Sequence, residues 1–240
     1  MKLDKLWNGL KRIENGDYVL EGDLICEESL EVDLDDRLVV RGKVEVKKNL
    51  KVRCGINAGE GINAGCGINA GCGIKAGWGI NAGWGINAGC GINAGEGIKA
   101  GCGINAGWGI NAGCGIKAGE GIKAGEGIKA ETFIHCEKRI FAGLSVYHTS
   151  ENCKKSIECA ELRKGEVAFG DLVIVPKLKP CPFCGNKNVK CLPAAEIDER
   201  CKHDPESFAV VCDAQEGGCG ACGGYEMTKE AAIENWQNRV

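Results

Sequence analysis

A six-residue unit repeats along the middle of the chain. From Gly55 to Glu126 the motif GI(N/K)AGx occurs twelve times without interruption, and a further copy begins at Gly127. The glycines are spaced by four and two residues, which excludes the every-third-glycine pattern of collagen. An α-helix this rich in glycine would lose about 1 kcal/mol at each glycine relative to alanine. The repeat therefore predicts short strands.

Each repeat has the pattern of one short strand followed by a corner. Isoleucine and alanine stand two positions apart and share one face of an extended chain, while Asn or Lys points the other way. So short a strand buries its apolar face only when coils stack on one another, which predicts a mainly β fold, a parallel β-solenoid. Glycine is expected at the corners because it accepts backbone angles that other residues avoid. Stacked asparagines are expected to hydrogen-bond from coil to coil, and the lysines to discourage side-by-side association.

The same phase continues beyond the perfect hexads, which span 55–130. The matching positions are Val32, Leu38, Val44 and Leu50 before Ile56, and Ile134, Ile140 and Val146 after the repeats. These positions predict a solenoid over residues 19–148. Three hexads per turn would give a three-sided prism and two a flattened one, and we expect three sides.

The segments on either side of the solenoid are expected to cap it, because an open end exposes unpaired strand edges. Apolar residues at helical spacing predict a capping helix within residues 1–18; they are Leu3, Leu6, Trp7, Leu10 and Ile13. Residues 149–178 are expected to form short strands and turns as a C-terminal cap and linker. The repeat and its lead-in VVRGKVEVKKNLKV resemble the bactofilins, β-helical cytoskeletal proteins that form polymers, and this resemblance implies a structural role.

The last position of each hexad varies among Cys, Trp and Glu. If their indoles face solvent, Trp78, Trp84 and Trp108 would offer a contact patch; the alternative is that they only fill corners. The neighbouring cysteines are six or twelve residues apart, which is not a metal-ligand signature. Segments such as GEGINAG have GxGxxxG spacing and no following helix, which argues against a phosphate-binding loop.

A second kind of sequence begins near Lys179. All five prolines lie at or after Pro176, and this change in composition predicts a separate domain at 179–240. Cys181 and Cys184 have the CxxC spacing of a zinc knuckle, and Gly185 lets the turn close. Tetrahedral Zn²⁺ accepts four thiolates, and a domain of about sixty residues has too little core to do without such a metal. The candidates for the other two ligands are Cys212, Cys219 and Cys222.

KPCPFCG, CGACGGY and EAAIENWQNR resemble the Lar-type restriction-alleviation proteins, small zinc-ribbon proteins of phages and prophages. The resemblance covers about a quarter of the chain. It implies an α+β zinc ribbon that binds Zn²⁺ through four cysteines, with Cys222 as an alternative ligand; the four are Cys181, Cys184, Cys212 and Cys219. The chain departs from the family where DAQEGG separates Cys212 from Cys219, since the family motif reads C-x-x-C there.

The end of the chain predicts a helix that packs on this ribbon. Thr228 is a suitable N-cap, and Glu230 lies in the favourable first turn. Ile233 and Trp236 share one helical face and are expected in the core. Cys201-Lys-His203 lies in a polar stretch and is not expected to bind metal.

No catalytic constellation is recognisable, so we expect a binding protein and not an enzyme. The three histidines, His135, His148 and His203, carry no nucleophile–base pattern. From Cys181 to Val240 there are six basic and ten acidic residues, a net charge of −4, which makes direct nucleic acid binding unlikely. The N-terminus lacks an apolar signal-peptide region, and no stretch approaches the roughly 20 apolar residues of a membrane span, so we expect a cytoplasmic protein without membrane contact.

The resemblance to the Lar family implies an anti-restriction protein of phage or prophage type, in a bacterial host cell. Its partner would be a host restriction–modification or other defence protein, reached by protein–protein contact through the zinc ribbon. The alternative is a structural scaffold that assembles end to end as a homo-oligomer, with the ribbon as an adaptor.

Overall fold

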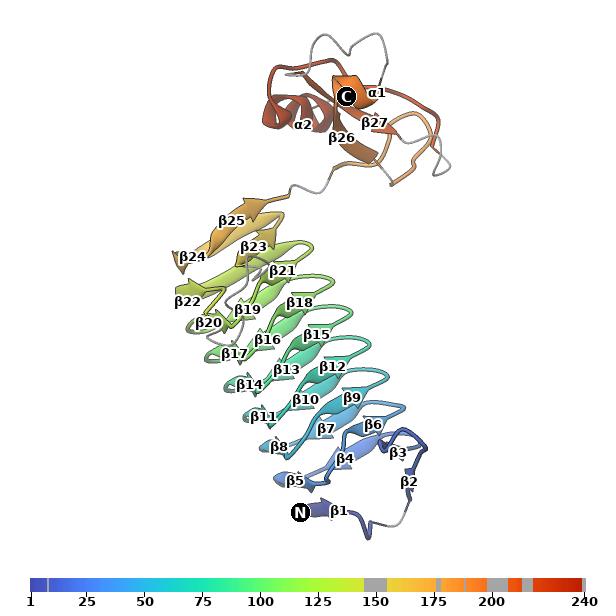
Figure 1. The fold of residues 1–240 in the computed structure, drawn as a ribbon, viewed down its shortest axis with the longest axis vertical. Coiled ribbons are helices and arrows are strands. Elements are labelled where there is room, and N and C mark those ends of the chain that lie inside the picture. The colour runs from blue at the N-terminus through green and yellow to red at the C-terminus, as the bar shows by residue number, and fades with distance from the viewer. Residues whose placement is uncertain are drawn as a thin grey trace. The chain divides into compact units, whose positions relative to one another are not determined.

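The structure, a computed structural model, describes residues 1–7, 9–144, 155–175, 178–187, 189–197, 207–212 and 218–238 (Figure 1). The chain divides into two compact units, Met1–Val175 and Pro176–Val240. The first unit is a parallel β-solenoid, and the second is a small region with one strand pair and two helices among its described residues.

The solenoid is built from short strands joined by tight corners. In chain order the strands are β1 (Lys2–Asp4), β2 (Leu10–Arg12), β3 (Tyr18–Leu20), β4 (Leu24–Cys26), β5 (Leu30–Asp33), β6 (Leu38–Val40), β7 (Val44–Val46), β8 (Leu50–Val52), β9 (Ile56–Ala58), β10 (Ile62–Ala64), β11 (Ile68–Ala70), β12 (Ile74–Ala76), β13 (Ile80–Ala82), β14 (Ile86–Ala88), β15 (Ile92–Ala94), β16 (Ile98–Ala100), β17 (Ile104–Ala106), β18 (Ile110–Ala112), β19 (Ile116–Ala118), β20 (Ile122–Ala124), β21 (Ile128–Ala130), β22 (Phe133–Phe141), β23 (Ser156–Cys159), β24 (Glu161–Phe169) and β25 (Asp171–Ile174).

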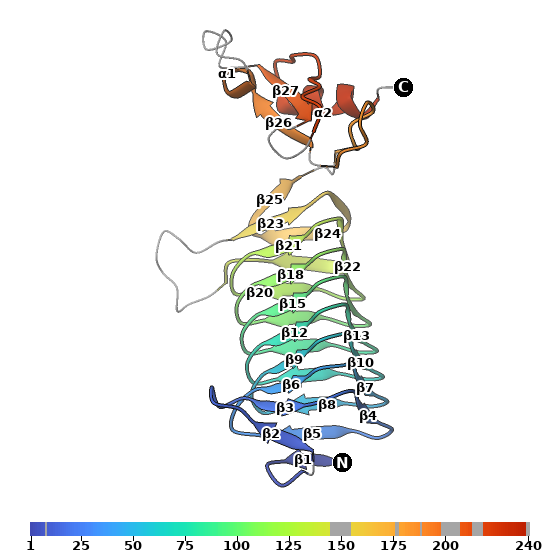
Figure 2. The ribbon, with the colours of Figure 1, turned by 90° about the vertical axis from the view of Figure 1, so that its right-hand side faces the viewer.

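Each strand of the repeats pairs in parallel with the strand three places further along the chain. β9 pairs with β12, and the register places Ile56 beside Ile74, 18 residues later. The same step joins β10 to β13 and β11 to β14, so each turn uses three hexads and the solenoid has three sides, as predicted. Figure 2 shows these strands stacked in rungs. β22 pairs with both β19 and β20 and thereby joins two of the three faces into one sheet.

The predicted inward and outward faces of the strands are confirmed. Every isoleucine of the hexads is at most 1% exposed and every alanine at most 8%, so the two columns form one continuous core. Between them the asparagines form ladders on the surface. The Asn81 side-chain amide donates a hydrogen bond to the Asn63 side-chain oxygen at 3.0 Å, and Asn105 donates to Asn87 at 3.0 Å.

The corner glycines are needed for a reason that differs from the one expected. None of the glycines from Gly55 to Gly127 has a positive φ, so unusual backbone angles do not explain them. Instead, a Cβ atom on Gly89 would lie 2.0 Å from the carbonyl oxygen of Gly71 on the preceding coil. The glycine after each alanine is therefore fixed by the close approach of neighbouring coils.

The predicted N-terminal capping helix within residues 1–18 is wrong. The segment forms β1, which adds to β5, and β2, which pairs antiparallel with β3. Leu3 is fully buried, but Leu6 is 92% exposed, so no helical apolar face packs on the first coil. The reason is that the first coil presents unpaired backbone groups, and a strand satisfies these groups whereas a helix cannot.

The register of the first coil also differs from the prediction. Leu30 pairs with Leu50 and Val32 with Val52, so Leu30, and not Val32, occupies the isoleucine position. Between Leu30 and Leu38 there are eight positions instead of six, which lengthens this corner. Leu34, only 1% exposed, fills the longer corner.

At the other end, Ile134 and Ile140 keep the predicted phase and pair with Ile116 and Ile122. Val146, the next expected position, lies outside the described residues. The place beside Ile128 is taken by Ile157 of β23. β24 then pairs with β22 and β25 with β23, so the described part of the segment predicted as cap and linker continues the stack.

The second unit contains β26 (Val189–Pro193) and β27 (Phe208–Cys212), which pair antiparallel, and the helices α1 (Ala194–Ile197) and α2 (Lys229–Gln237). The Thr228 side chain accepts a hydrogen bond from the Ala231 N–H at 3.2 Å, which confirms the predicted N-cap. Trp236 is 2% exposed, packs with Val210, and donates its indole N–H to the Lys179 carbonyl at 3.0 Å. No helix in the described parts of the chain has the length and apolar character to cross a bilayer.

Candidate metal centre

The first half of the candidate site is the turn that carries Cys181 and Cys184. The Gly185 N–H donates to the Cys181 carbonyl at 2.8 Å, and the Cys181 N–H donates to the Asn186 carbonyl at 2.9 Å. Gly185 has φ +72°, a conformation that side chains disfavour, so glycine is required for the turn to close. These bonds fold the backbone around the two sulfurs.

The second half has the same hydrogen-bond pattern around Cys212 and Cys219, despite the longer spacing. The Gly220 N–H donates to the Cys212 carbonyl at 3.1 Å, and the Cys212 N–H donates to the Ala221 carbonyl at 2.8 Å. Gly220 has φ +75°, close to the value at Gly185. The extra residues between Cys212 and Cys219 therefore leave the turn itself intact.

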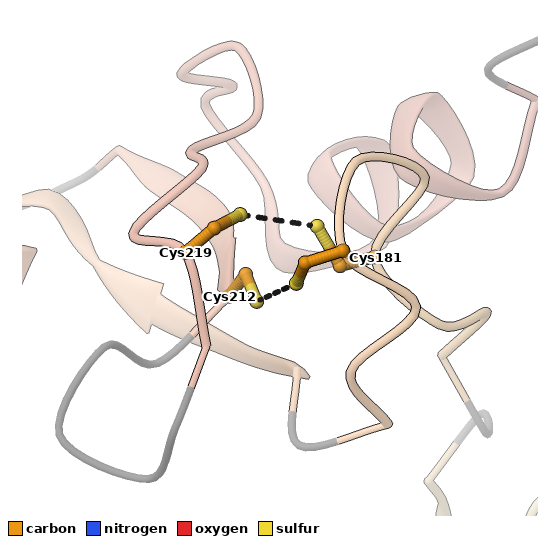
Figure 3. Close-up of side chains that lie close together, drawn as sticks. Cys181, Cys212 and Cys219 are labelled. Carbon is orange, nitrogen blue, oxygen red and sulfur yellow. Dashed lines mark hydrogen bonds between the residues drawn. The ribbon is translucent and has the colours of Figure 1, made fainter.

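The two turns bring four sulfurs together. The Sγ atoms of Cys181, Cys184, Cys212 and Cys219 all lie within 4.8 Å of one another. The Sγ atoms of Cys181 and Cys219 are 3.6 Å apart, and those of Cys184 and Cys212 are 3.5 Å apart; Figure 3 shows Cys181, Cys212 and Cys219 converging from the two turns. Cys181 and Cys212 are buried, while Cys184 and Cys219 are exposed.

This cluster fits a tetrahedral metal such as zinc. With Zn–S bonds of about 2.3 Å, a tetrahedral site places its sulfurs about 3.8 Å apart, close to the two distances above. The four thiols fill all four positions, which is typical of a structural site, whereas a catalytic zinc keeps one position open. The hydrophobic cluster around the site is small and includes Cys181 and Cys212 themselves, with Val210 and Trp236.

The thiols also have sharply different acidities. The Asn186 N–H hydrogen-bonds Cys184 and lowers the pKa of its thiol to about 6. Burial raises the pKa of the Cys212 thiol to about 12. Without a cation the four sulfurs therefore cannot all be thiolates at neutral pH, since like charges at this distance repel one another. A bound metal ion would supply the compensating charge.

Cys222, the alternative ligand, is not part of the cluster. Its Sγ donates to the Gly223 carbonyl at 3.2 Å, and its backbone forms an antiparallel bridge with Val211. The sequence could not decide between Cys219 and Cys222, because each is followed by glycine. Only Gly220 adopts the positive φ of the turn, and Gly223 does not. Cys201 and His203 lie outside the described residues.

The three indoles predicted as a contact patch are exposed but do not meet. Trp78, Trp84 and Trp108 are 56%, 63% and 52% exposed. Because a turn takes 18 residues, they lie on three different edges of the solenoid: their N–H groups donate to Glu60, Cys66 and Cys90 of three separate corner rows. They therefore do not form one surface.

Together these features define the protein as a β-solenoid with a four-cysteine cluster near its C-terminus that is suited to a metal ion. Comparison with known protein families, with curated proteins and with solved structures finds no match. Membership of the Lar family therefore has no support beyond the motifs themselves and stays a prediction.

Proposed function

We propose that this chain is a non-enzymatic binding protein in which Zn²⁺, held by Cys181, Cys184, Cys212 and Cys219, stabilises a C-terminal unit that contacts another protein. The observation that carries the proposal is the convergence of four sulfurs from two equivalent turns. A closed site of this kind orders the surrounding backbone and leaves no position for a substrate.

The finer proposal is that the chain alleviates restriction in the cytoplasm of a bacterial host, by contact with a restriction–modification or other defence protein. It is supported by the motifs around Cys181, Cys219 and Trp236, and by the charge of the C-terminal segment. The net charge of −4 from Cys181 to Val240 suits a basic protein surface better than a phosphate backbone.

The test is phage plating on a restricting host. Expression of the protein is expected to raise the plating efficiency of unmodified phage, and Cys181→Ser, which removes one ligand, is expected to abolish the effect. Cys222→Ser is the matched control, because Cys222 is an exposed cysteine of the same unit outside the cluster. Absence of any rescue by the unaltered protein would refute the anti-restriction proposal.

A second candidate function is a scaffold whose copies assemble end to end. It is favoured by β25, the last strand of its sheet among the described residues. Leu172 and Ile174 pair with Ile157 and Cys159, which are buried, yet they are themselves 42% and 48% exposed. An apolar strand edge of this kind favours the addition of another strand.

Negative-stain imaging tests the scaffold. Filaments are expected from the unaltered protein, and Leu172→Lys is expected to shorten them because it places a charge in the stacked core. Val173→Lys is the matched control: Val173 is 42% exposed on the same strand but lies at the outward position, where the repeats already carry lysine. Monodisperse monomers of the unaltered protein at high concentration would contradict end-to-end assembly.

A further inference from the structure

One edge of the solenoid carries cysteines on three consecutive coils. The corner residues Cys54, Cys72 and Cys90 follow one another at steps of 18 residues. Their backbones are joined directly, since the Cys72 N–H donates to the Cys54 carbonyl at 3.0 Å and the Cys90 N–H donates to the Cys72 carbonyl at 3.2 Å. Trp108 continues the row on the next coil and donates its N–H to the Cys90 carbonyl at 3.2 Å.

The other two edges do not bring corner cysteines of neighbouring coils together. On one edge, Trp84 separates Cys66 from Cys102. On the other, the Cys114 N–H donates to the Glu96 carbonyl, so a carboxylate side chain and not a thiol precedes Cys114. Among the described corner positions, adjacent thiols therefore occur on one edge only, although all three edges use the same letters.

The three thiols are accessible. They line a groove of about 570 Å³ together with Trp108. Cys72 is exposed, and Cys54 and Cys90 are partly exposed. The Cys54 Sγ donates to the carbonyls of Leu34 and Asp35 at 3.4 and 3.3 Å, which holds it at one end of the row.

The spacing of the row suits a particular coordination geometry. Stacked coils of a β-solenoid rise by about 4.8 Å, so sulfurs on neighbouring coils are about that far apart. A metal–sulfur bond is about 2.3 Å, so a linear sulfur–metal–sulfur unit spans roughly 4.6 Å. Linear coordination by two thiolates is characteristic of soft monovalent cations, and Cu(I) is one that thiolate ligands select.

The surroundings favour a thiophilic cation over a hard one. The carboxylates that reach the groove are already paired, Asp35 with Lys5 and Asp36 with Arg12. Burial, and next the neighbouring Cys72, raise the pKa of the Cys90 thiol, and burial likewise raises the pKa of Cys54. The thiols are therefore protonated at neutral pH, and a cation must bind sulfur strongly enough to displace these protons.

We propose that Cys54, Cys72 and Cys90 form a binding site for a soft, thiophilic monovalent cation of the Cu(I) type, separate from the four-cysteine cluster. Cys72 is the central ligand, because it belongs to both neighbouring pairs. Each cation bridges two sulfurs and releases the proton of each thiol that it converts to thiolate. No change in the oxidation state of the metal or of sulfur is involved.

The test is an anaerobic titration of the full-length, zinc-loaded protein with Cu(I), in the presence of a chromophoric Cu(I) chelator as competitor. The unaltered protein is expected to take up one more Cu(I) per chain than Cys72→Ser. Cys66→Ser is the matched control, since it removes a corner cysteine without an adjacent thiol and is expected to take up as much Cu(I) as the unaltered protein. The four-cysteine cluster is identical in all variants, so its own Cu(I) uptake cancels in these differences.

Two further measurements make the result independent of the folding of one variant. Cys54→Ser combined with Cys90→Ser leaves Cys72 alone and is expected to lose the same Cu(I) as Cys72→Ser. Quenching of Trp108 fluorescence, taken as the difference from Trp108→Phe, is expected with Cu(I) in the unaltered protein and absent in Cys72→Ser. Equal Cu(I) uptake by the unaltered protein and Cys72→Ser, or an equal loss in Cys66→Ser, would overturn the proposal.

Discussion

The carbonyl oxygen of Gly71 lies so close to Gly89 on the next coil that a Cβ atom at Gly89 would be 2.0 Å from it. The contact recurs through the repeats, where a Cβ on Gly83 would lie 2.0 Å from the Gly65 oxygen. The backbone hydrogen bond from Gly89 N–H to Ala70 oxygen, at 3.0 Å, holds the coils at this separation. A side chain cannot enter here unless the coils move apart.

Gly89→Ala is therefore expected to destabilise the solenoid by about 1–3 kcal/mol, the usual range for overpacking a rigid site. Gly91→Ala, two positions along, is the matched control: its Cβ would meet the Gly109 oxygen at 3.3 Å, which a small shift relieves. The difference is measured by urea unfolding followed by circular dichroism. Equal midpoints for the two variants would show that coil spacing does not dictate this glycine.

Removal of the metal is expected to unfold the second unit and leave the solenoid intact. One Zn²⁺ per chain is expected in the purified protein, and a strong chelator is expected to abolish hydrogen-exchange protection at Val210 and Val211 in β27. Ile92, within the solenoid, should keep its protection, because its neighbours are other coils. Unchanged protection in β27 after complete chelation would contradict a structural role for the metal.

The asparagine ladder is expected to contribute to stability where its hydrogen bonds are continuous. Asn87 donates to Asn69 at 3.1 Å and accepts from Asn105 at 3.0 Å, so Asn87→Ala breaks two bonds. A loss of about 1–2 kcal/mol is expected, since each such bond contributes about 0.5–1.5 kcal/mol net. Thermal unfolding measures it.

Asn57→Ala is the control for the ladder. Asn57 also lies at mid-strand, but its neighbours in the stack are Val39 and Lys75, so it has no asparagine on either side. A smaller loss is expected there. If the two variants lose equal stability, the ladder bonds are not the cause.

Glu45 is expected to make the stability of the first coils depend on pH. Hydrogen bonds from Lys47 at 2.8 Å and Lys43 at 3.0 Å lower the pKa of the Glu45 carboxyl from 4.5 to about 2. Because the folded pKa is the lower one, the stabilisation is complete above pH 4.5 and is lost as the pH falls from 4.5 to about 2. An NMR titration of the carboxyl should show the low midpoint, and Lys47→Ala should raise it.

The comparison of Glu45→Gln with the unaltered protein checks the sign. The variant is expected to be less stable at pH 7 and equally stable at pH 2, where both side chains are neutral. The difference should be small and should shrink with added salt, because these charges are exposed. A larger difference at low pH than at neutral pH would contradict the assignment.

The repeat predicted much of the fold because its information is local. Alternation of Ile, Asn and Ala over three residues determines which side chains face inward, and this pattern needs no knowledge of distant residues. The Cys181 turn was predictable for the same reason, as Cys184 and Gly185 are its neighbours in sequence. The cap at Thr228 and the burial of Trp236 likewise follow from spacing within one helix.

The failures lie where distant backbone decided the outcome. Leu3 to Ile13 have helical spacing, yet the open edge of the first coil recruited the segment into strands. The choice of Cys219 over Cys222 depended on which glycine could close a turn onto Cys212, across the long insertion. The corner letters had no visible order at steps of six or twelve and acquired one only at 18.

The sequence by itself thus determined that the chain forms short strands with an Ile and Ala face, and that one CxxC turn is ready to hold a metal. Only the tertiary structure decided which corners share an edge, why Gly89 cannot carry a side chain, and which cysteines face one another. The physical reason is that strand alternation is set by neighbouring residues, whereas stacking joins residues a full turn apart through backbone hydrogen bonds and steric contact.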